Sequence, residues 1–371
     1  MRIGLNLLYL LPGIVGGTET YAAGLLQGLA EVDDQNDYLV FVNAESAFWS
    51  LPKTKNIQRI VCPVRAQSRL KRLVHEQFAL PGLAKAHRLD LLHSLGYIAP
   101  LRLPCPGVVT IHDMNTKGHG RSMGLPKRLL LSFLVRRSAQ SSTHVITVSE
   151  FSKQEILSHL HLVPKKISVI HEAPLRGRLT ADTPGSPDVP RPYILAFASL
   201  SPHKNIPRLI EAFALLAPTI PHQLVLAGHI PADGGITQAI ARCDLARRVT
   251  LAGYLPREKV HALLSAAELF VFPSLYEGFG LPVLEAQARG AVVACANQGA
   301  LPEVAGNGAA FFAPESARDM AEVIRRCLFD LALRQRLQAM GQRNLDRFSW
   351  NKTAQETIAV YERISQALTT P

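Results

Sequence analysis

Two glutamates stand eight residues apart in the stretch Pro273–Gly290, whose sequence is PSLYEGFGLPVLEAQARG. Glu277 directly precedes Gly278, and Gly280 follows before Glu285. A glycine-rich loop ahead of a helix can turn backbone N–H groups and the positive end of the helix dipole toward an anion. The two carboxylates could then bind hydroxyl groups on either side of that anion. Either glutamate alone would be an ordinary solvated side chain, but the whole ordered pattern indicates a binding site.

The residues around this loop predict a strand–loop–helix unit. Leu269–Phe272 is a short apolar run followed by a proline, which is typical of a buried parallel strand. Val283–Ala288 is rich in helix-forming residues, and Pro282 suits the first turn of a helix. We therefore expect Glu277 in the loop and Glu285 about one turn into the helix.

A second candidate is Lys204, which follows His203 in the loop after the expected strand Tyr193–Ala198. We expect Asn205 or Ser201 to cap the helix that comes next. A lysine at this place can neutralise a diphosphate as a point charge. It could also be a solvated loop residue, but its position after a strand favours a function.

A third candidate, His112, stands with Asp113 directly after the apolar segment Val108–Ile111. The carboxyl ends of parallel strands are where ligand-binding residues lie. His112 can donate to a sugar hydroxyl, and Asp113 can orient a ring nitrogen or a neighbouring loop. A single histidine is more often structural, but this position favours a function.

Gly16 and Gly17 follow the first expected strand, Ile3–Leu11, and precede a helix that Thr18 should cap and that should run to about Ala30. The glycines would let the backbone approach a phosphate or a sugar, or would simply form a tight turn. Their spacing does not match the G-x-G-x-x-G of nicotinamide dinucleotide folds, which disfavours a dehydrogenase.

Several catalytic motifs are missing from the sequence. It contains no D-x-D triplet, no His or Cys cluster with metal-ligand spacing, no G-x-S-x-G elbow and no Walker loop. A bound nucleotide diphosphate would therefore have its charge met by Lys204, helix N-termini and loop amides. We expect no metal and no cofactor.

The composition is that of a globular cytoplasmic protein. The chain has 371 residues, 47% of them apolar and 19% charged, which suffices for two α/β domains. Its five cysteines are scattered, as in proteins whose thiols stay reduced. Ile3–Leu11 is too short to span a bilayer and is followed by a glycine loop, so we interpret it as a strand rather than a signal peptide.

Positive charge is concentrated in the first half of the chain. Residues 1–185 contain 22 Lys and Arg against 13 Asp and Glu, so they carry +9 of the net charge of +11. Such a charge attracts an anionic surface or an anionic substrate. We expect no nucleic-acid partner.

One basic amphipathic helix is expected in this half. Its apolar residues recur at helical spacing and its basic residues lie on the other faces, and the two sets are Leu70, Leu73, Val74 and Phe78 against Arg69, Lys71 and Arg72. We expect the apolar face to pack against the core, with the basic side in solvent. Contact of the same helix with an anionic membrane is compatible with that packing.

Short apolar segments alternate with helical stretches along the chain, which predicts parallel sheets covered by helices. The segments not yet named are Tyr38–Asn43, Asp90–His93, His144–Val148, Gln223–Ala227, Val249–Ala252, Val292–Ala296 and Ala309–Phe312. Glycine and proline are frequent in Arg176–Pro192, as in a linker. We predict an α/β fold with two doubly wound domains facing a central cleft, residues 1–185 and 186–348, and a final helix in 349–371.

In this order, the motifs resemble those of the retaining glycosyltransferases of family 4, which have the GT-B fold. E-G-F-G-L-P-V-L-E, at Glu277–Glu285, is similar to the E-x7-E signature of that family. The resemblance covers nearly the whole chain, with G-G-T-E-T near the amino terminus, T-I-H-D (Thr110–Asp113), T-V-S-E-F-S-K (Thr147–Lys153), S-P-H-K-N-I (Ser201–Ile206), G-Y-L-P (Gly253–Pro256), P-E-V-A-G (Pro302–Gly306) and F-S-W-N-K-T at the start of the last helix.

The resemblance implies a role for each candidate residue. Glu285 would hold the ribose hydroxyls of a nucleotide sugar, and Glu277 would contact the transferred sugar. Lys204, with His203 beside it, would bind the diphosphate. His112 would contact the sugar near the reacting carbon.

The resemblance also implies several backbone contacts. Phe279, Gly280 and Leu281 would offer N–H groups to the sugar or the phosphate. Gly16 and Gly17 would approach the donor from the opposite domain.

The remaining implied positions concern the base and the domain crossing. Tyr254 and Leu255 would border the nucleotide base, and the last helix, from about Trp350, would cross back onto the first domain. The chain departs from the family pattern at Ala198, where many relatives have an arginine six residues before the lysine. Binding of the diphosphate would then depend more on Lys204.

The resemblance thus implies retaining, metal-independent transfer of a hexose, with mannose expected, from a nucleotide diphosphate sugar to a hydroxyl acceptor. We expect GDP-mannose or a UDP-hexose as the donor. The expected acceptor is a lipid-linked or polysaccharide glycan at the inner face of a membrane. Two alternatives stay open: a nucleotide-sugar epimerase of the same fold, which needs no acceptor, and a non-catalytic nucleotide-sugar-binding subunit, which releases no diphosphate.

Overall fold

The computed structural model describes residues 1–114, 125–175, 189–199, 201–230 and 234–369. The chain forms two compact units, Met1–Ala173 with Phe348–Pro371, and Pro174–Arg347. The domain limits predicted from the sequence lie after residues 185 and 348. Most of the linker expected at Arg176–Pro192 lies outside the described residues.

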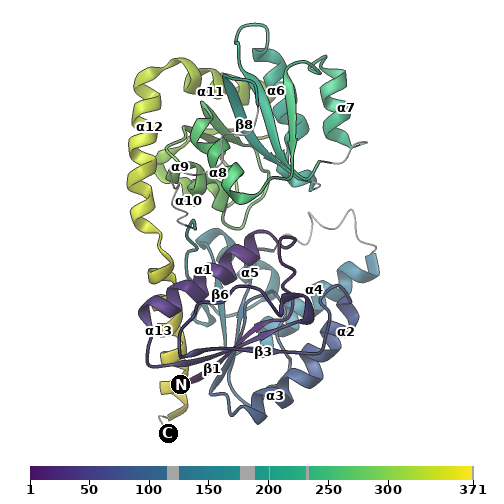
Figure 1. Ribbon diagram of the computed structural model, residues 1–371, viewed down its shortest axis with the longest axis vertical. Helices are drawn as coiled ribbons and strands as arrows, with labels where there is room; N and C mark the ends of the chain where they lie inside the picture. Colours follow the sequence, from purple (N-terminus) through teal and green to yellow (C-terminus); the bar gives the residue numbers. More distant parts are fainter. Residues whose placement is uncertain (115–124, 176–188, 200, 231–233, 370–371) are drawn as a thin grey trace. The chain divides into compact units, whose positions relative to one another are not determined.

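The first unit is built on a seven-stranded parallel sheet with the order β3-β2-β1-β4-β5-β6-β7 (Figure 1). Its strands are β1 (Arg2–Leu7), β2 (Asp37–Val42), β3 (Ile57–Val61), β4 (Leu91–Ser94), β5 (Gly107–Thr110), β6 (His144–Thr147) and β7 (Ile167–Val169). Its helices are α1 (Gly17–Val32), α2 (Arg69–Val74), α3 (Leu80–Ala86), α4 (Leu125–Ser141), α5 (Glu150–Leu160) and α13 (Trp350–Thr369), and a π-helical turn η2 (His75–Ala79) joins α2 to α3.

The second unit repeats this architecture with six parallel strands in the order β10-β9-β8-β11-β12-β13. The strands are β8 (Tyr193–Ala198), β9 (Gln223–Gly228), β10 (Val249–Gly253), β11 (Leu269–Phe272), β12 (Val293–Ala296) and β13 (Ala310–Phe312). The helices are α6 (Ile206–Leu216), α7 (Gly235–Arg242), α8 (Arg257–Ala266), α9 (Leu281–Ala288), α10 (Leu301–Ala305), α11 (Ala317–Phe329) and α12 (Leu331–Asn344).

In both sheets the strand order reverses beside the first strand of the unit. The reversal lies between β1 and β4 in the first sheet and between β8 and β11 in the second. At such a point, consecutive connections run in opposite directions and leave a crevice at the carboxyl ends of the strands, where ligands of this fold class bind. The predicted doubly wound α/β architecture is confirmed for both units.

The first sheet differs from the sequence prediction in its two edge strands and in the length of β1. Strands β3 and β7 were not predicted, because an edge strand needs only a few apolar residues and β7 has three residues in all. Strand β1 ends at Leu7 rather than at Leu11. The Asn6 side chain accepts from the Leu8 N–H over 3.1 Å, which turns the chain out of the sheet.

The predicted cap of α1 is wrong, and the predicted cap of α6 is right in position only. Gly16, with φ 62°, is the N-cap of α1, and Thr18 lies inside the helix. Asn205 occupies the N-cap position of α6 but in the left-handed conformation, and its side chain does not cap the helix. That amide instead donates to the carbonyls of Pro273 and Pro314 over 3.1 and 2.8 Å, so it ties the start of α6 to the loop after β11.

The basic helix exists, but its apolar face is not buried as predicted. Leu70 and Phe78 are 71% and 79% exposed, and Val74 is exposed as well. Only Leu73 packs against a core cluster of the first unit. Helical periodicity placed the four apolar residues on one helical stretch. Of the four, the core clusters contact only Leu73.

Helix α13 packs along α1 through two glycines of α1. A Cβ atom at Gly28 would lie 2.3 Å from the carbonyl oxygen of Trp350, and one at Gly24 would lie 2.0 Å from the indole of the same residue. These distances are far below van der Waals contact, so both positions require glycine. Within the first unit, the carboxyl-terminal helix is therefore fixed against the first helix of the chain.

We predict that Gly28→Ala lowers the free energy of unfolding of the first unit by about 1–3 kcal/mol, because the backbone of α13 must move. The matched control is Gly82→Ala, in an exposed position of α3 with no atom within 4 Å of an added Cβ. It should stabilise the protein slightly, since alanine favours a helix over glycine by about 1 kcal/mol. Both tryptophans, Trp49 and Trp350, lie in this unit, so urea unfolding followed by tryptophan fluorescence measures it. Equal stability of the two variants would contradict the packing argument.

Candidate active site

Two predicted catalytic residues, 73 positions apart in the sequence, meet at the switch point of the second sheet. Lys204 follows β8, and Glu277 follows β11, its neighbour in the sheet. The Lys204 ammonium donates to Glu277 Oε1 over 2.5 Å. Both side chains are mostly buried, at 22% and 15% exposure, so the ion pair is only partly screened by water.

The loops that carry this ion pair are held to each other by their backbones. The N–H of Leu275 donates to the carbonyl of His203 over 2.7 Å. On the other side, the N–H of Ala300 donates to the carbonyl of Glu277 over 3.1 Å. The ammonium of Lys204 also lies 5.0 Å from the centre of the Phe272 ring, which provides a cation–π contact. The position of the pair is therefore fixed by contacts from several sides.

The glycine loop and its helix form as predicted. Gly280 has φ 107° and is the N-cap of α9, and Pro282 lies in the first turn. An added Cβ at Gly280 would lie 2.6 Å from a Leu301 methyl group, so the conformation and the space both require glycine here. Phe279 and Leu281 are buried beside it, so their side chains anchor the loop rather than face solvent.

Glu285 lies in α9, beside two arginines. Its carboxylate is 3.6 Å from the guanidinium of Arg257, at the start of α8, and its side chain is only 18% exposed. Burial raises the pKa of Glu285, and the positive charges of Arg257 and Arg289 partly oppose that rise. Arg289 also contacts the ring of His261 over 2.9 Å, and burial, together with the two arginines, lowers the pKa of His261 to about 4. Glu285 is thus no exposed helix residue.

Tyr254 and Leu255 follow β10, two strands away from β8 in the sheet. Tyr254 is 70% exposed, and Leu255 packs against the core of the second unit. They lie at the carboxyl edge of the same sheet as Lys204, which is the edge where the predicted base-binding residues belong.

In the first unit, Gly16 and Gly17 form the entry to α1 after β1. Both are exposed, and an added Cβ at either would meet no atom within 4 Å. Gly16 needs its positive φ, whereas neither backbone conformation nor a neighbouring described atom requires glycine at position 17. Glu19 accepts from the N–H of Gly13 over 2.7 Å and so shapes the loop before the helix.

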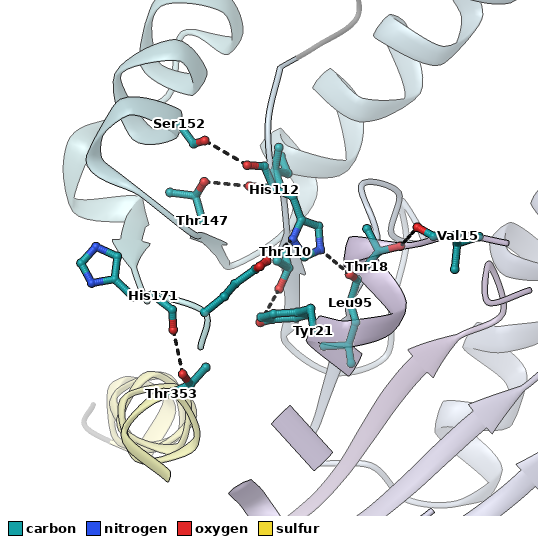
Figure 2. A network of polar contacts seen from close by, with 12 residues as sticks. Val15, Thr18, Tyr21, Leu95, Thr110, His112, Thr147, Ser152, His171 and Thr353 are labelled. Carbon is teal, nitrogen blue, oxygen red and sulfur yellow. Dashed lines mark hydrogen bonds and ion pairs between the residues drawn. The ribbon is translucent and has the colours of Figure 1, made fainter. Parts of the chain in front are cut away.

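His112 lies just after β5 and has both ring nitrogens bonded. Nδ1 is 3.0 Å from the carboxylate of Glu172, and Nε2 is 3.2 Å from the carbonyl of Leu95, a contact drawn in Figure 2. A carbonyl oxygen only accepts, so Nε2 carries a hydrogen. Burial would lower the pKa of His112, but the hydrogen bond to Glu172 and its charge outweigh burial, and the pKa is raised. The raised pKa favours the imidazolium form of His112 beside the Glu172 carboxylate.

The ring of Tyr21 packs against the His112 ring, and the hydroxyl of Tyr21 begins a chain of buried hydrogen bonds. Tyr21 stands edge-on to that ring, with centroids 4.8 Å apart, and its hydroxyl is 3.2 Å from Thr110 Oγ1 (Figure 2). Thr110 Oγ1 contacts Nε2 of buried His93 over 2.8 Å, and the other nitrogen of His93 contacts the hydroxyl of Tyr361 on α13 over 2.6 Å. Because burial lowers the pKa of His93 to about 3, this second histidine stays neutral.

Three residues that lie beside the candidates were not predicted from the sequence. Glu172 follows β7 and, at 4% exposure, is buried against His112. Arg257 and Arg289 lie near Glu285. Arg289 had a signal, since it follows Glu285 by four residues, one helical turn. The sequence signal for Glu172 was weaker: it is an acid just past the end of a strand. The sequence contained no signal for Arg257, because its contact depends on how α8 packs against α9.

Among the residues that the structure describes, no group of three or more His, Cys, Asp or Glu side chains is arranged to hold a metal ion.

We predict that Glu172→Gln reverses the pH dependence of stability that His112 causes. In the wild type the folded-state pKa of His112 is raised, so the stabilisation is complete below the ordinary pKa of about 6.5 and is lost as pH rises through the folded-state value. Without the carboxylate, burial dominates and lowers the folded-state pKa. Stability should then be lost as pH falls toward and below about 6.5.

Urea unfolding at several pH values, together with NMR titration of labelled histidine, measures this change. Exposed Glu31→Gln, on α1, is the matched control and should behave as the wild type. An unchanged His112 titration in Glu172→Gln would contradict the pairing.

Comparison with family models gives one match in each unit. A model of glycosyltransferase family 4 matches residues 15–173, and a model of glycosyl transferases group 1 matches residues 183–344. The two models together leave only the chain ends and a short connection unmatched.

Curated and solved relatives agree with these models. O-antigen chain mannosyltransferase B of Escherichia coli is 28% identical over 328 residues, which are 84% of this chain and 84% of that protein. A serotype-specific mannosyltransferase of Escherichia coli is 32% identical over 235 residues, which are 62% of this chain but 28% of that protein. The structure of Anabaena HepE in complex with UDP-glucose matches with a TM-score of 0.72 and 21% identity over 100% of both chains. The fold is GT-B, and the chain belongs to the group 1 glycosyltransferases of family 4.

Proposed function

We propose that the protein is a retaining mannosyltransferase that uses GDP-mannose, or a UDP-hexose as the second choice, and a lipid-linked or polysaccharide glycan as acceptor. The observation that carries this proposal is the Lys204–Glu277 ion pair at the switch point of the second sheet. Glu285 lies in the helix that follows. A cation, a glycine loop and two acids are thus placed where a doubly wound sheet binds its ligand.

In this proposal Lys204 binds the diphosphate while it orients Glu277. A lysine ammonium has three hydrogens, so one can remain on Glu277 while the others reach phosphate oxygens. Glu277, held from one side, would accept a hydroxyl of the transferred sugar with its other oxygen. Backbone N–H groups of residues 279–281, at the start of α9, would add positive potential.

Glu285 would hold the ribose hydroxyls, and Tyr254 and Leu255 would border the base. The basic environment of Glu285 supports this role, because Arg257 and Arg289 favour its ionised, accepting form against burial. In the first unit, Gly16, Gly17 and His112 would contact the donor sugar. His112 would have to give up one of its two bonds to do so, or would act by orienting the backbone around it.

The proposed chemistry is substitution at the anomeric carbon from the face of the leaving group. The acceptor oxygen forms its bond to that carbon as the bond to the phosphate oxygen breaks, and the acceptor proton passes to the departing diphosphate. Glu277 is a poor nucleophile because Lys204 neutralises it. The protein then acts by positioning and by stabilising the leaving group. Trapping of a covalent sugar adduct in a slow variant would contradict this mechanism.

The choice of mannose is supported by two relatives whose names are those of mannosyltransferases. A nucleotide sugar as donor is supported by the solved relative that contains UDP-glucose. We further propose that the protein works at the inner face of a membrane, as its basic first half suggests. In the described ranges, no helix combines the length and apolar character needed to cross a bilayer.

We predict that the two glutamates fail in different ways. Glu285→Ala should raise the dissociation constant of the donor about tenfold or more, since it removes hydrogen bonds to a charged acceptor. Glu277→Ala should bind the donor nearly as the wild type does but turn over about 100-fold more slowly. Calorimetry and initial-rate assays separate the two, with exposed Glu258→Ala as the control. If both variants lose only donor binding, and to the same extent, then Glu277 has no role in the reaction itself.

Donor identity is tested by thermal unfolding with GDP-mannose, UDP-glucose, UDP-galactose and ADP-glucose. We expect GDP-mannose to raise the melting temperature most, because at equal ligand concentration the ligand with the lowest Kd stabilises the folded state most. If a UDP-hexose gives the larger shift, that hexose rather than mannose is the transferred sugar. Turnover of donor without any acceptor would instead favour the epimerase, and donor binding without diphosphate release would favour the binding subunit.

A further inference from the structure

Three large apolar side chains of the basic helix are exposed on one side of the first unit. Leu70, Val74 and Phe78 are 71%, 50% and 79% exposed and follow each other at four-residue spacing. All three line one surface hollow, together with Arg65 and Lys71. A contiguous exposed apolar patch of this kind marks a site of interaction.

Helix α4 lies beside these segments and exposes apolar side chains of its own. Gln77 of η2 and Ser138 of α4 both donate to the carbonyl of Ala99, each over 3.1 Å, so these two helical segments are neighbours. Helix α2 is drawn next to α4 in Figure 1, and its Leu73 packs against the core cluster that contains Val135 of α4. Helix α4 contributes three exposed side chains, with exposures of 59%, 51% and 56%: Leu129, Leu130 and Phe133. We call the six residues the α2–α4 surface: Leu70, Val74, Phe78, Leu129, Leu130 and Phe133.

The charges near the α2–α4 surface are almost all positive. Residues 46–75 contain seven Lys and Arg, residues 114–149 contain six, and neither stretch contains an acid. The two nearest acids along the chain are engaged: Glu76 is buried beside Arg72, and Glu45 accepts the N–H of Ala66 over 3.0 Å. Among the described residues of these two stretches, the exposed charged side chains are cations, such as Lys71 and Arg136.

We infer that the α2–α4 surface inserts its apolar side chains into an anionic lipid bilayer while the flanking cations contact the headgroups. Apolar residues combined with cations are what an interfacial helix offers a membrane. A second copy of the chain fits less well, because a two-fold contact would bring like charges together. The inference identifies the surface that would contact the membrane in the proposed function. It rests on that proposal for the location of the acceptor at a membrane. Lipid binding, however, is measured without sugar transfer, so either can fail alone.

The test is co-sedimentation of the full chain with vesicles of phosphatidylcholine, with and without phosphatidylglycerol. The wild type should bind the anionic vesicles more tightly. Leu70→Ser/Phe78→Ser should weaken that binding at least about tenfold, because two apolar side chains no longer leave water. Leu130→Ser/Phe133→Ser should act in the same direction.

Two matched controls guard this result. Phe329→Ser removes an exposed phenylalanine of the second unit, with an exposure of 62%, and should bind as the wild type does. Lys71→Gln/Arg136→Gln should weaken binding to anionic vesicles about fivefold for each charge and should leave binding to neutral vesicles unchanged. Lys259→Gln/Arg326→Gln, which removes the same charge from exposed helix positions of the second unit, should have no effect.

Wild-type binding by Leu70→Ser/Phe78→Ser, with unchanged thermal unfolding, would overturn the inference. So would equal binding of the wild type to neutral and anionic vesicles. If the wild type ignores vesicles but is a dimer in light scattering, and Leu70→Ser/Phe78→Ser is a monomer, the surface binds a second copy and the inference is wrong.

Discussion

The ion pair of Lys204 and Glu277 is the interaction on which the donor side of the molecule depends. Neither residue is near the other in sequence, and each stands in a loop at the end of one of two paired strands. The pairing of β8 with β11, and the reversal of strand order there, set the distance between the ammonium and the carboxylate. Topology, rather than local sequence, therefore brings the cation to the acid, and both to the crevice where a doubly wound sheet binds anionic ligands.

The other candidate acids are likewise held next to positive groups. Glu285 is largely buried and lies near Arg257, and Glu172 is buried against His112. A buried carboxylate without a partner would protonate or destabilise the fold, so each acid is retained with a cation. Acids held in this way are well suited to accept hydrogen bonds from sugar hydroxyls and poorly suited to attack carbon. This is why the proposed chemistry assigns them to binding and positioning.

Local chemistry could be predicted from the sequence, and contacts between elements could not. Strands β8 and β11 have the bounds that their apolar runs predicted, and Pro282 lies in the first helical turn, because such signals are contained in a few neighbouring residues. The edge strands β3 and β7, by contrast, have hardly any pattern of their own. Periodicity grouped Leu70 with Phe78 on one helix but could not show that their side chains face solvent. Glu172, likewise, gains a role only from the packing that places it against His112.

Retaining transfer of mannose can be followed by proton NMR of the complete reaction, with GDP-α-mannose as donor and a panel of synthetic lipid-linked mannosides as acceptors. We expect GDP to be released only when an acceptor is present, and the first product signal to be that of a new α-linked mannose. A β-linked product, or consumption of the donor without any acceptor glycan, would contradict this proposal.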